Sequence, residues 1–155
     1  MQKILISGCL VGELVRFDGK SKAMTHPIII GWFNEGRLLS VCPEVTGGLP
    51  IPRPAAELQP NGIVITNIGA DVTKAFEKGA NIALDLCRKH QIKMAILKQS
   101  SPSCGSKQVY DGSFSGIKIA GEGLTCQLLR QHGIAVFCEE TLEEAVRFFD
   151  TNEIN

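Results

Sequence analysis

The 155-residue sequence is long enough for one domain with a hydrophobic core, and its 44% hydrophobic and 21% charged residues exclude a disordered chain. Its 16 basic and 16 acidic side chains cancel, whereas proteins that bind nucleic acid normally carry a surplus of positive charge. We therefore expect a small-molecule partner and no nucleic acid. Charge and composition leave the oligomeric state open.

The N-terminal segment MQKILISGCL holds one lysine and an apolar run too short for a signal peptide or a membrane span. No other segment approaches transmembrane length, so we expect a cytoplasmic protein that does not contact a membrane. Thiols stay reduced in that compartment. The six cysteines therefore predict metal ligands, catalytic groups or buried small side chains rather than disulfides.

The first half of the chain alternates short apolar runs with a helical pattern. A strand is predicted at 3–7, a helix at 27–34 and a second strand at 38–42, although Ile28–Ile30 also suits an extended segment. A loop rich in proline and glycine follows at 43–57. Residues 58–68 then predict a hairpin that turns at Asn61-Gly62, a dipeptide typical of tight hairpins.

The second half continues the alternation with the longest helical pattern, capped by Asp71 or Thr73 and reaching about residue 90. A strand is predicted at 94–98 and a long loop at 99–123. The part at 106–122 is long for a compact domain, and loops of this length often act as lids. The last elements are a helix at 124–131, a strand at 134–137 and a helix that opens with the capping box Thr141-x-x-Glu144.

Four strands with intervening helices predict an α/β fold, with a doubly wound and mostly parallel sheet of Rossmann-like or flavodoxin-like type. The hairpin is a small insertion, and residues 1–155 form a single domain. Ligands of such sheets bind beyond the carboxyl ends of the strands, because the loops there converge. Candidate functional residues are therefore those that follow the predicted strands.

Three cysteines lie at such positions: Cys9 after the first strand, Cys42 at the end of the second and Cys104 after the third. Each lies in a loop with glycine or proline. Close pairs such as C-x2-C, which are typical of structural zinc sites, do not occur here. Thiolates from separate loops suit an iron–sulfur cluster better. Three ligands on a four-iron cluster leave one iron open to act as a Lewis acid.

A more ordinary interpretation stands beside this one for every cysteine. A single cysteine at a strand end is usually a small buried side chain, and Cys87 and Cys126 inside helices fit that use. Cys138 ends the fourth strand and is either a fourth ligand or a packing residue. The convergence of three cysteines at one sheet edge favours a site.

Polar residues near these cysteines are candidate catalytic groups. Glu44 follows Cys42 by two residues and suits a general acid or base, but it could equally cap a loop or pair with Arg53. Ser101 and Ser103 flank Pro102 beside Cys104, where their hydroxyls either contact substrate or cap the local turn.

Further candidates for substrate binding are Arg16 and Asp18 in the segment LVRFDGKSK, and Arg53 in the segment PRPAAE. A solvated turn with ordinary ion pairs explains these residues as well. The sequence has no G-x-G-x-x-G after the first strand and no Walker loop, so a dinucleotide or ATP site has no motif support.

Four ordered motifs resemble the thiouracil desulfidase family, long catalogued as a domain of unknown function. They are SGCLVGELVRFDG (7–19), CPEVTGGLPIPR (42–53), GADVTKAFEKGA (69–80) and LKQSSPSCG (97–105), and the resemblance covers nearly the whole chain. Phe17 stands where the family usually has tyrosine. Longer family members carry an added domain, and we expect none within these 155 residues.

The resemblance implies a 4Fe–4S cluster on Cys9, Cys42 and Cys104, a catalytic glutamate at Glu44 and a catalytic serine at Ser101. Ser100 and Ser103 are near enough to leave the serine open. The implied reaction is a non-redox desulfuration of a thiolated pyrimidine such as thiouracil, in which the substrate sulfur binds the open iron. Uracil and hydrosulfide are the products.

Two other classes use the same residues differently. An iron–sulfur or metal-binding sensor, or a ligand-binding module, would hold a metal without turnover, but it gains nothing from an ionisable group such as Glu44. A thiol enzyme without metal would use one cysteine as a nucleophile. The sequence does not fix the position of sulfur in the preferred substrate.

Overall fold

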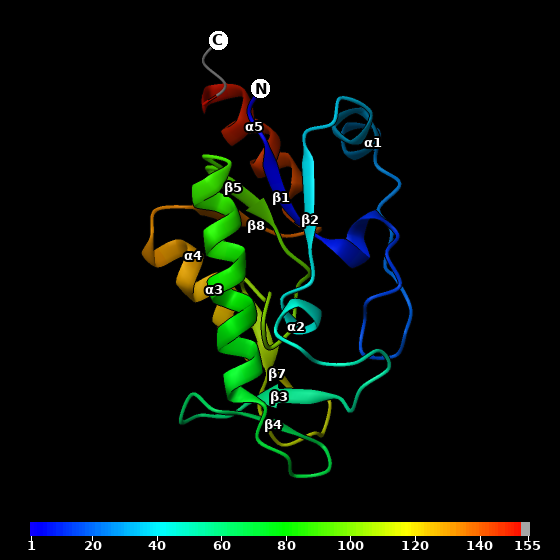
Figure 1. Ribbon diagram of the computed structural model, residues 1–155, viewed down its shortest axis with the longest axis vertical. Coiled ribbons are helices and arrows are strands. Elements are labelled where there is room, and N and C mark those ends of the chain that lie inside the picture. The colour runs from blue at the N-terminus through cyan, green and yellow to red at the C-terminus, as the bar shows by residue number, and fades with distance from the viewer. Residues whose placement is uncertain (153–155) are drawn as a thin grey trace.

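The computed structural model describes residues 1–152 and contains a four-stranded parallel sheet with helices on both faces (Figure 1). The strands are β1 (Ile4–Ser7), β2 (Leu38–Val41), β5 (Met94–Ile96) and β8 (Ala135–Phe137), in the order β2-β1-β5-β8. This order is that of a flavodoxin-like sheet without its last strand, so the predicted fold class is confirmed.

The strand register brings all four carboxyl ends to one edge of the sheet. Ile4 pairs with Leu38 and Leu5 with Ala95, and the neighbouring strands run parallel. Met94 pairs with Ala135 in the same sense. In Figure 1 the N-terminus lies at the top, and the strands run down toward α2 (Pro43–Thr46). The loops that leave the strands therefore meet at the lower end.

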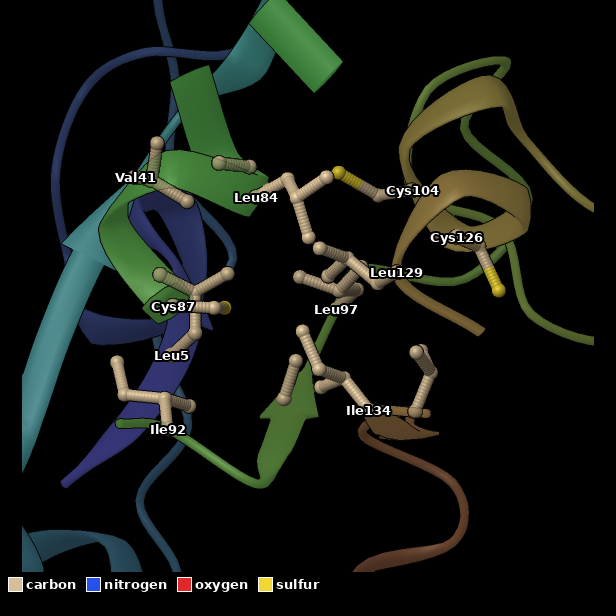
Figure 2. Packing of buried hydrophobic residues seen from close by; sticks show 13 residues of the cluster. Leu5, Val41, Leu84, Cys87, Ile92, Leu97, Cys104, Cys126, Leu129 and Ile134 are labelled. Carbon is tan, nitrogen blue, oxygen red and sulfur yellow. The ribbon is translucent and has the colours of Figure 1, made fainter. Parts of the chain in front are cut away.

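Two apolar clusters fill the space between the sheet and its helices. Side chains alternate across a strand, so Leu5 faces α3 (Thr73–Lys89) and α4 (Leu124–Gln131), as Figure 2 shows. Ile4 and Ile6 face α1 (Pro27–Asn34) and α5 (Leu142–Asn152). The strands are covered on both faces, which explains why β1 reads as a continuous apolar run.

The helix termini follow their sequence signals only in part. His26 caps α1 by accepting the amide of Ile28 on Nδ1 at 3.1 Å, which confirms a helix where an extended segment was the alternative. Asp71 accepts the amide of Thr73, but the capping position of α3 is Val72, which makes no side-chain cap bond. The hydroxyl of Thr141 instead accepts the amide of Cys138 at 2.9 Å, so it bonds backward from α5. Among residues 1–152, no helix is long and apolar enough to cross a membrane.

The predicted hairpin is confirmed, and the structure contains a second one. β3 (Ala56–Leu58) and β4 (Val64–Thr66) pair antiparallel through a turn in which Gly62 has a φ of 87°. β6 (Gln108–Tyr110) pairs with β7 (Lys118–Ala120) inside segment 106–122. The prediction of a structureless loop there was wrong, because these three-residue strands are too short for a visible alternation.

Two further short elements lie in segments predicted to be loops. The 3-10 helix η1 (Gly8–Val11) follows β1 directly, and α2 follows β2 directly. Each is a single turn, and a single turn is too short to give a helical period in the sequence. Both lie where the candidate cysteines Cys9 and Cys42 are found.

Close backbone contact fixes α2 against α3. A Cβ atom on Gly79 would lie 1.8 Å from the carbonyl oxygen of Pro43, and one on Gly47 would lie 2.0 Å from that of Ala75. Only glycine lets the two backbones approach this closely. The helix α3 therefore determines where the segment beginning with Cys42 lies.

This contact predicts that Gly79→Ala destabilises the protein. The added methyl group must push α2 away, and overpacking of this kind costs about 1–3 kcal/mol in the free energy of unfolding. Gly31→Ala is the matched control, because Gly31 is also helical and has no atom within 4 Å of a Cβ. Its helix should gain roughly 0.5–1 kcal/mol. Equal unfolding midpoints in urea for the two variants would contradict the contact.

Candidate active site

The three candidate cysteines all lie beyond the carboxyl edge of the sheet. Cys9 is in η1 after β1, Cys42 is the residue before α2, and Cys104 is in the loop after β5. Cys9 and Cys104 are buried, and Cys42 is half-buried. All six cysteines of the chain are free thiols. The predicted placement at one edge is therefore what the fold produces.

The thiols approach this edge from both faces of the sheet. Cys9 belongs to the apolar cluster under α1 and α5. Cys104 belongs to the cluster under α3 and α4, where Figure 2 shows its sulfur directed toward Leu84. Burial is the main cause of the raised pKa of Cys9 and of Cys104, and a thiolate at Cys42 would raise both further. The three thiols are thus close enough to affect one another's ionisation.

Burial keeps these thiols protonated when no metal is bound. Burial raises the pKa of Cys9 to about 11, with a further increase from Cys42 and a decrease from Lys98. The pKa of Cys104 is also raised by burial, against a hydrogen bond from Ser7. Burial raises the pKa of Cys42 as well, although the backbone amide of Val45 opposes this increase. Metal binding at these thiols would release protons, because the ligand is the thiolate.

The donor set fits an iron–sulfur cluster. Thiolates are the protein ligands of such clusters, and these three come from separate loops, with Cys9 and Cys104 buried and Cys42 half-buried. Among residues 1–152, no three His, Cys, Asp or Glu side chains are arranged around the position of a single metal ion. A four-iron cluster is larger than one ion, so that absence does not bear on a cluster site.

Glu44 forms an ion pair with Arg53, in which Nε donates to Oε1 at 3.0 Å. The Arg53 side chain is only 4% exposed, and its other groups donate to the carbonyls of Pro50 and Val15. Its Nη2 lies 4.0 Å from the sulfur of Cys42. Each nitrogen of the Arg53 guanidinium thus donates to an oxygen of the protein itself, which argues against the expected substrate contact. Its bond to Oε1 instead orients the Glu44 carboxylate.

Arg16 and Asp18 form a turn beside the site. Their side chains pair at 3.2 Å and remain about a quarter exposed, and Asp18 accepts the amide of Lys20. The carbonyl of Phe17 in the same turn accepts the amide of Arg53 at 2.8 Å. The turn is therefore attached to the segment that holds Glu44, and its charges remain accessible to a substrate.

The serines near Cys104 differ in environment. The hydroxyl oxygen of Ser101 accepts the amides of Ser103 and Cys104, both at 3.1 Å, while the residue stays partly accessible. Ser103 is 0% exposed and shares a 2.8 Å hydrogen bond with Thr125. Its burial argues against the expected substrate contact. Ser100 has a φ of 70° and bridges to Val109.

Three residues that the sequence interpretation did not select also lie at this edge. Lys98 and Glu139, which follow β5 and β8, form an ion pair at 2.7 Å, and the positive charge of Lys98 lowers the pKa of Cys9. Gln99 is buried and accepts backbone amides with its side chain. Their positions at or just past the ends of two predicted strands were the available signal.

The fold and the three coupled thiols define an α/β protein with a cysteine-lined site at the carboxyl edge of its sheet. The sequence model of the family described as 2-thiouracil desulfurase matches residues 4–141. The chain belongs to this family.

Two similar proteins extend the comparison. A Bacillus subtilis (strain 168) protein described as "Uncharacterized protein YbbK" is 37% identical over 150 residues, covering 91% of this chain and 98% of the relative. A solved structure described as "[4Fe-4S]-dependent thiouracil desulfidase TudS" is 48% identical, with a TM-score of 0.95 and coverage of 97% of this chain and 99% of that one. The similarity therefore extends over the described fold and is not confined to the site.

Proposed function

We propose that this chain converts a thiolated pyrimidine such as 2-thiouracil to uracil and hydrosulfide, using a 4Fe–4S cluster on Cys9, Cys42 and Cys104. The observation that carries the proposal is the convergence of three cysteines at the carboxyl edge of the sheet, in a chain of this family. Water supplies the oxygen that replaces sulfur, so the reaction consumes one water and needs no oxidant or reductant. Residues 1–155 act as a single domain.

The cluster, when bound by three cysteines, supplies an iron without a protein ligand, and such an iron attracts a soft thiocarbonyl sulfur. Burial of Cys9 and Cys104 limits access of bulk water to that side of the site. Arg53 holds Oε1 of Glu44, which leaves Oε2 as the oxygen that takes a proton from the attacking water.

Ser101 supplies a hydroxyl donor at the site. Its oxygen accepts two backbone amides, so its own proton is available to a substrate oxygen or to water. The charged pair Arg16–Asp18 borders the same side through its attachment to Arg53 and offers polar contacts to the ring. A small free base suits these contacts, and no nucleic acid is required. A reducing compartment, such as the cytoplasm, suits six free thiols.

The direct test is to incubate the anaerobically reconstituted protein with 2-thiouracil and, separately, 4-thiouracil, and to quantify uracil and sulfide. We expect equal amounts of both products from at least one substrate, and none from protein without iron. A protein with its full cluster that leaves both compounds unchanged would exclude the proposed function. The sensor class would then be the better account.

The environments of the serines predict which of them acts. Ser101→Ala should lower kcat per bound cluster about 100-fold or more, a typical loss for a positioned proton donor; iron is quantified in the same sample because this hydroxyl also accepts the amide of Cys104. Ser103→Ala should keep kcat within about threefold and lower the free energy of unfolding by about 1 kcal/mol, because it removes one buried hydrogen bond. Steady-state kinetics and urea unfolding distinguish the two. The reverse pattern would assign the role to Ser103.

A further inference from the structure

The side chain of Gln99 is a buried hydrogen-bonding centre outside the residues assigned above. Gln99 is 4% exposed and lies three residues after the end of β5. Its Oε1 accepts four backbone amides at 3.0–3.2 Å, from Ser100, Ser106, Lys107 and Gln108. An amide oxygen has two lone pairs, and here four backbone amides point at one such oxygen. The segment that supplies these amides therefore folds around the Gln99 side chain.

The wrapped segment carries two of the proposed functional residues. Ser101 and Cys104 lie between the donors at Ser100 and Ser106, so the single oxygen of Gln99 closes the loop that presents them. The amide of Gly105 also bonds to the carbonyl of Ser101 within the loop. The backbone that carries the Cys104 sulfur is therefore closed by the Gln99 side chain.

The other end of Gln99 is attached to the end of β8. Its Nε2 donates to the sulfur of Cys138 at 3.3 Å, and its backbone amide donates to Oε1 of Glu139 at 2.8 Å. Cys138 is 0% exposed, and the Thr141 hydroxyl lies 3.6 Å from its sulfur. Cys138 thus has internal partners on the side of the sheet edge away from β2.

We propose that Gln99 is the positioning residue that holds Cys104 and Ser101 in place, and that Cys138 anchors Gln99 and is not a fourth cluster ligand. The inference rests on the proposed function only in taking Cys104 as a ligand. Partners of metal ligands have measurable effects of their own, and their loss typically costs about 10–100-fold in metal affinity or activity.

Three substitutions separate positioning from general stability. Gln99→Met keeps the length of the side chain but removes its acceptor and donor. Gln99→Glu keeps an acceptor oxygen for the four amides and loses only the donor to Cys138, so the loop should stay closed. Val64→Ala is the matched control, because Val64 is 0% exposed in β4 and its truncation destabilises the protein without removing a loop hydrogen bond.

The first measurement is amide hydrogen exchange in the metal-free protein. We expect exchange at Ser106, Lys107 and Gln108 to be about tenfold or more faster in Gln99→Met, and within about threefold of wild type in Gln99→Glu. Val64→Ala should leave these three amides protected relative to its own global stability. Wild-type protection in Gln99→Met, or equal loss of protection in Val64→Ala, would overturn the proposal.

The second measurement is the rate at which a chelator removes iron from the reconstituted protein. Gln99→Met should lose iron about 10–100-fold faster than wild type, whereas Val64→Ala should stay close to it. Gln99→Glu should lie between the two, because it keeps the acceptor and loses only the donor to Cys138. Cys138→Ala should take up the full iron content but lose it to the chelator faster than wild type, because Gln99 has lost its anchor. Failure to take up the full content would make Cys138 a ligand, and a wild-type rate of iron loss would remove the anchoring role; either result would overturn the proposal. Neither measurement uses turnover. An inactive wild type with a cluster would therefore defeat the proposed function and leave this inference standing.

Discussion

Replacing Cys104 with alanine is expected to abolish desulfuration and to reduce bound iron to less than about a tenth of the wild-type content. The variant removes one of only three protein ligands, and the cluster then lacks the attachment supplied by the loop after β5. Iron and acid-labile sulfide per chain, measured after anaerobic reconstitution, give the result directly. Sulfide release from 2-thiouracil gives the loss of activity.

Cys126→Ala is the matched control for this prediction. Cys126 is 0% exposed, belongs to the same apolar cluster as Cys104 and lies on α4, so its truncation costs comparable packing (Figure 2). It should keep full iron content and activity within about threefold, as substitutions remote from a site usually do. A Cys104→Ala protein with a complete cluster and normal turnover would refute the ligand assignment.

Glu44→Gln is expected to lower kcat by about 10²–10⁴-fold while leaving the iron content intact. A glutamine keeps an oxygen that accepts from Nε of Arg53, so the orientation of the segment survives, but it cannot take up a proton from water. Single-turnover kinetics with 2-thiouracil measure the chemical step, and visible absorption monitors the cluster in the same sample.

A carboxylate at the other end of the sheet supplies the control for Glu44. Glu35 pairs with Arg37 at 2.5 Å between α1 and β2, and Glu35→Gln should keep kcat within about twofold. If Glu44→Gln turned over at the wild-type rate, the carboxylate would be structural, as the alternative of simple pairing with Arg53 supposes.

The sequence predicted the sheet well because its signals are strong in this fold. β1 is buried on both faces, so residues 4–7 read as an apolar run, and the long α3 shows its buried face at Phe76, Ala80 and Leu84. Elements of one turn or three residues carry no such period. For that reason η1, α2 and the β6–β7 hairpin could not be foreseen.

The candidate site was only partly predictable for a different reason. A parallel sheet brings strand ends together whatever the side chains are, so Cys9, Cys42 and Cys104 could be placed at one edge. Hydrogen bonds across the fold follow no spacing in the sequence. The hydrogen bond that holds Arg53 to the carbonyl of Val15 and the role of Gln99 in the loop after β5 therefore emerged only from the structure.

Native mass spectrometry of the anaerobically reconstituted wild-type protein tests the central assignment most directly. We expect the mass of one chain with one four-iron, four-sulfide cluster, and loss of that mass increment in each of Cys9→Ala, Cys42→Ala and Cys104→Ala. A chain that carries a single metal ion, or a cluster that persists in all three variants, would contradict the assignment.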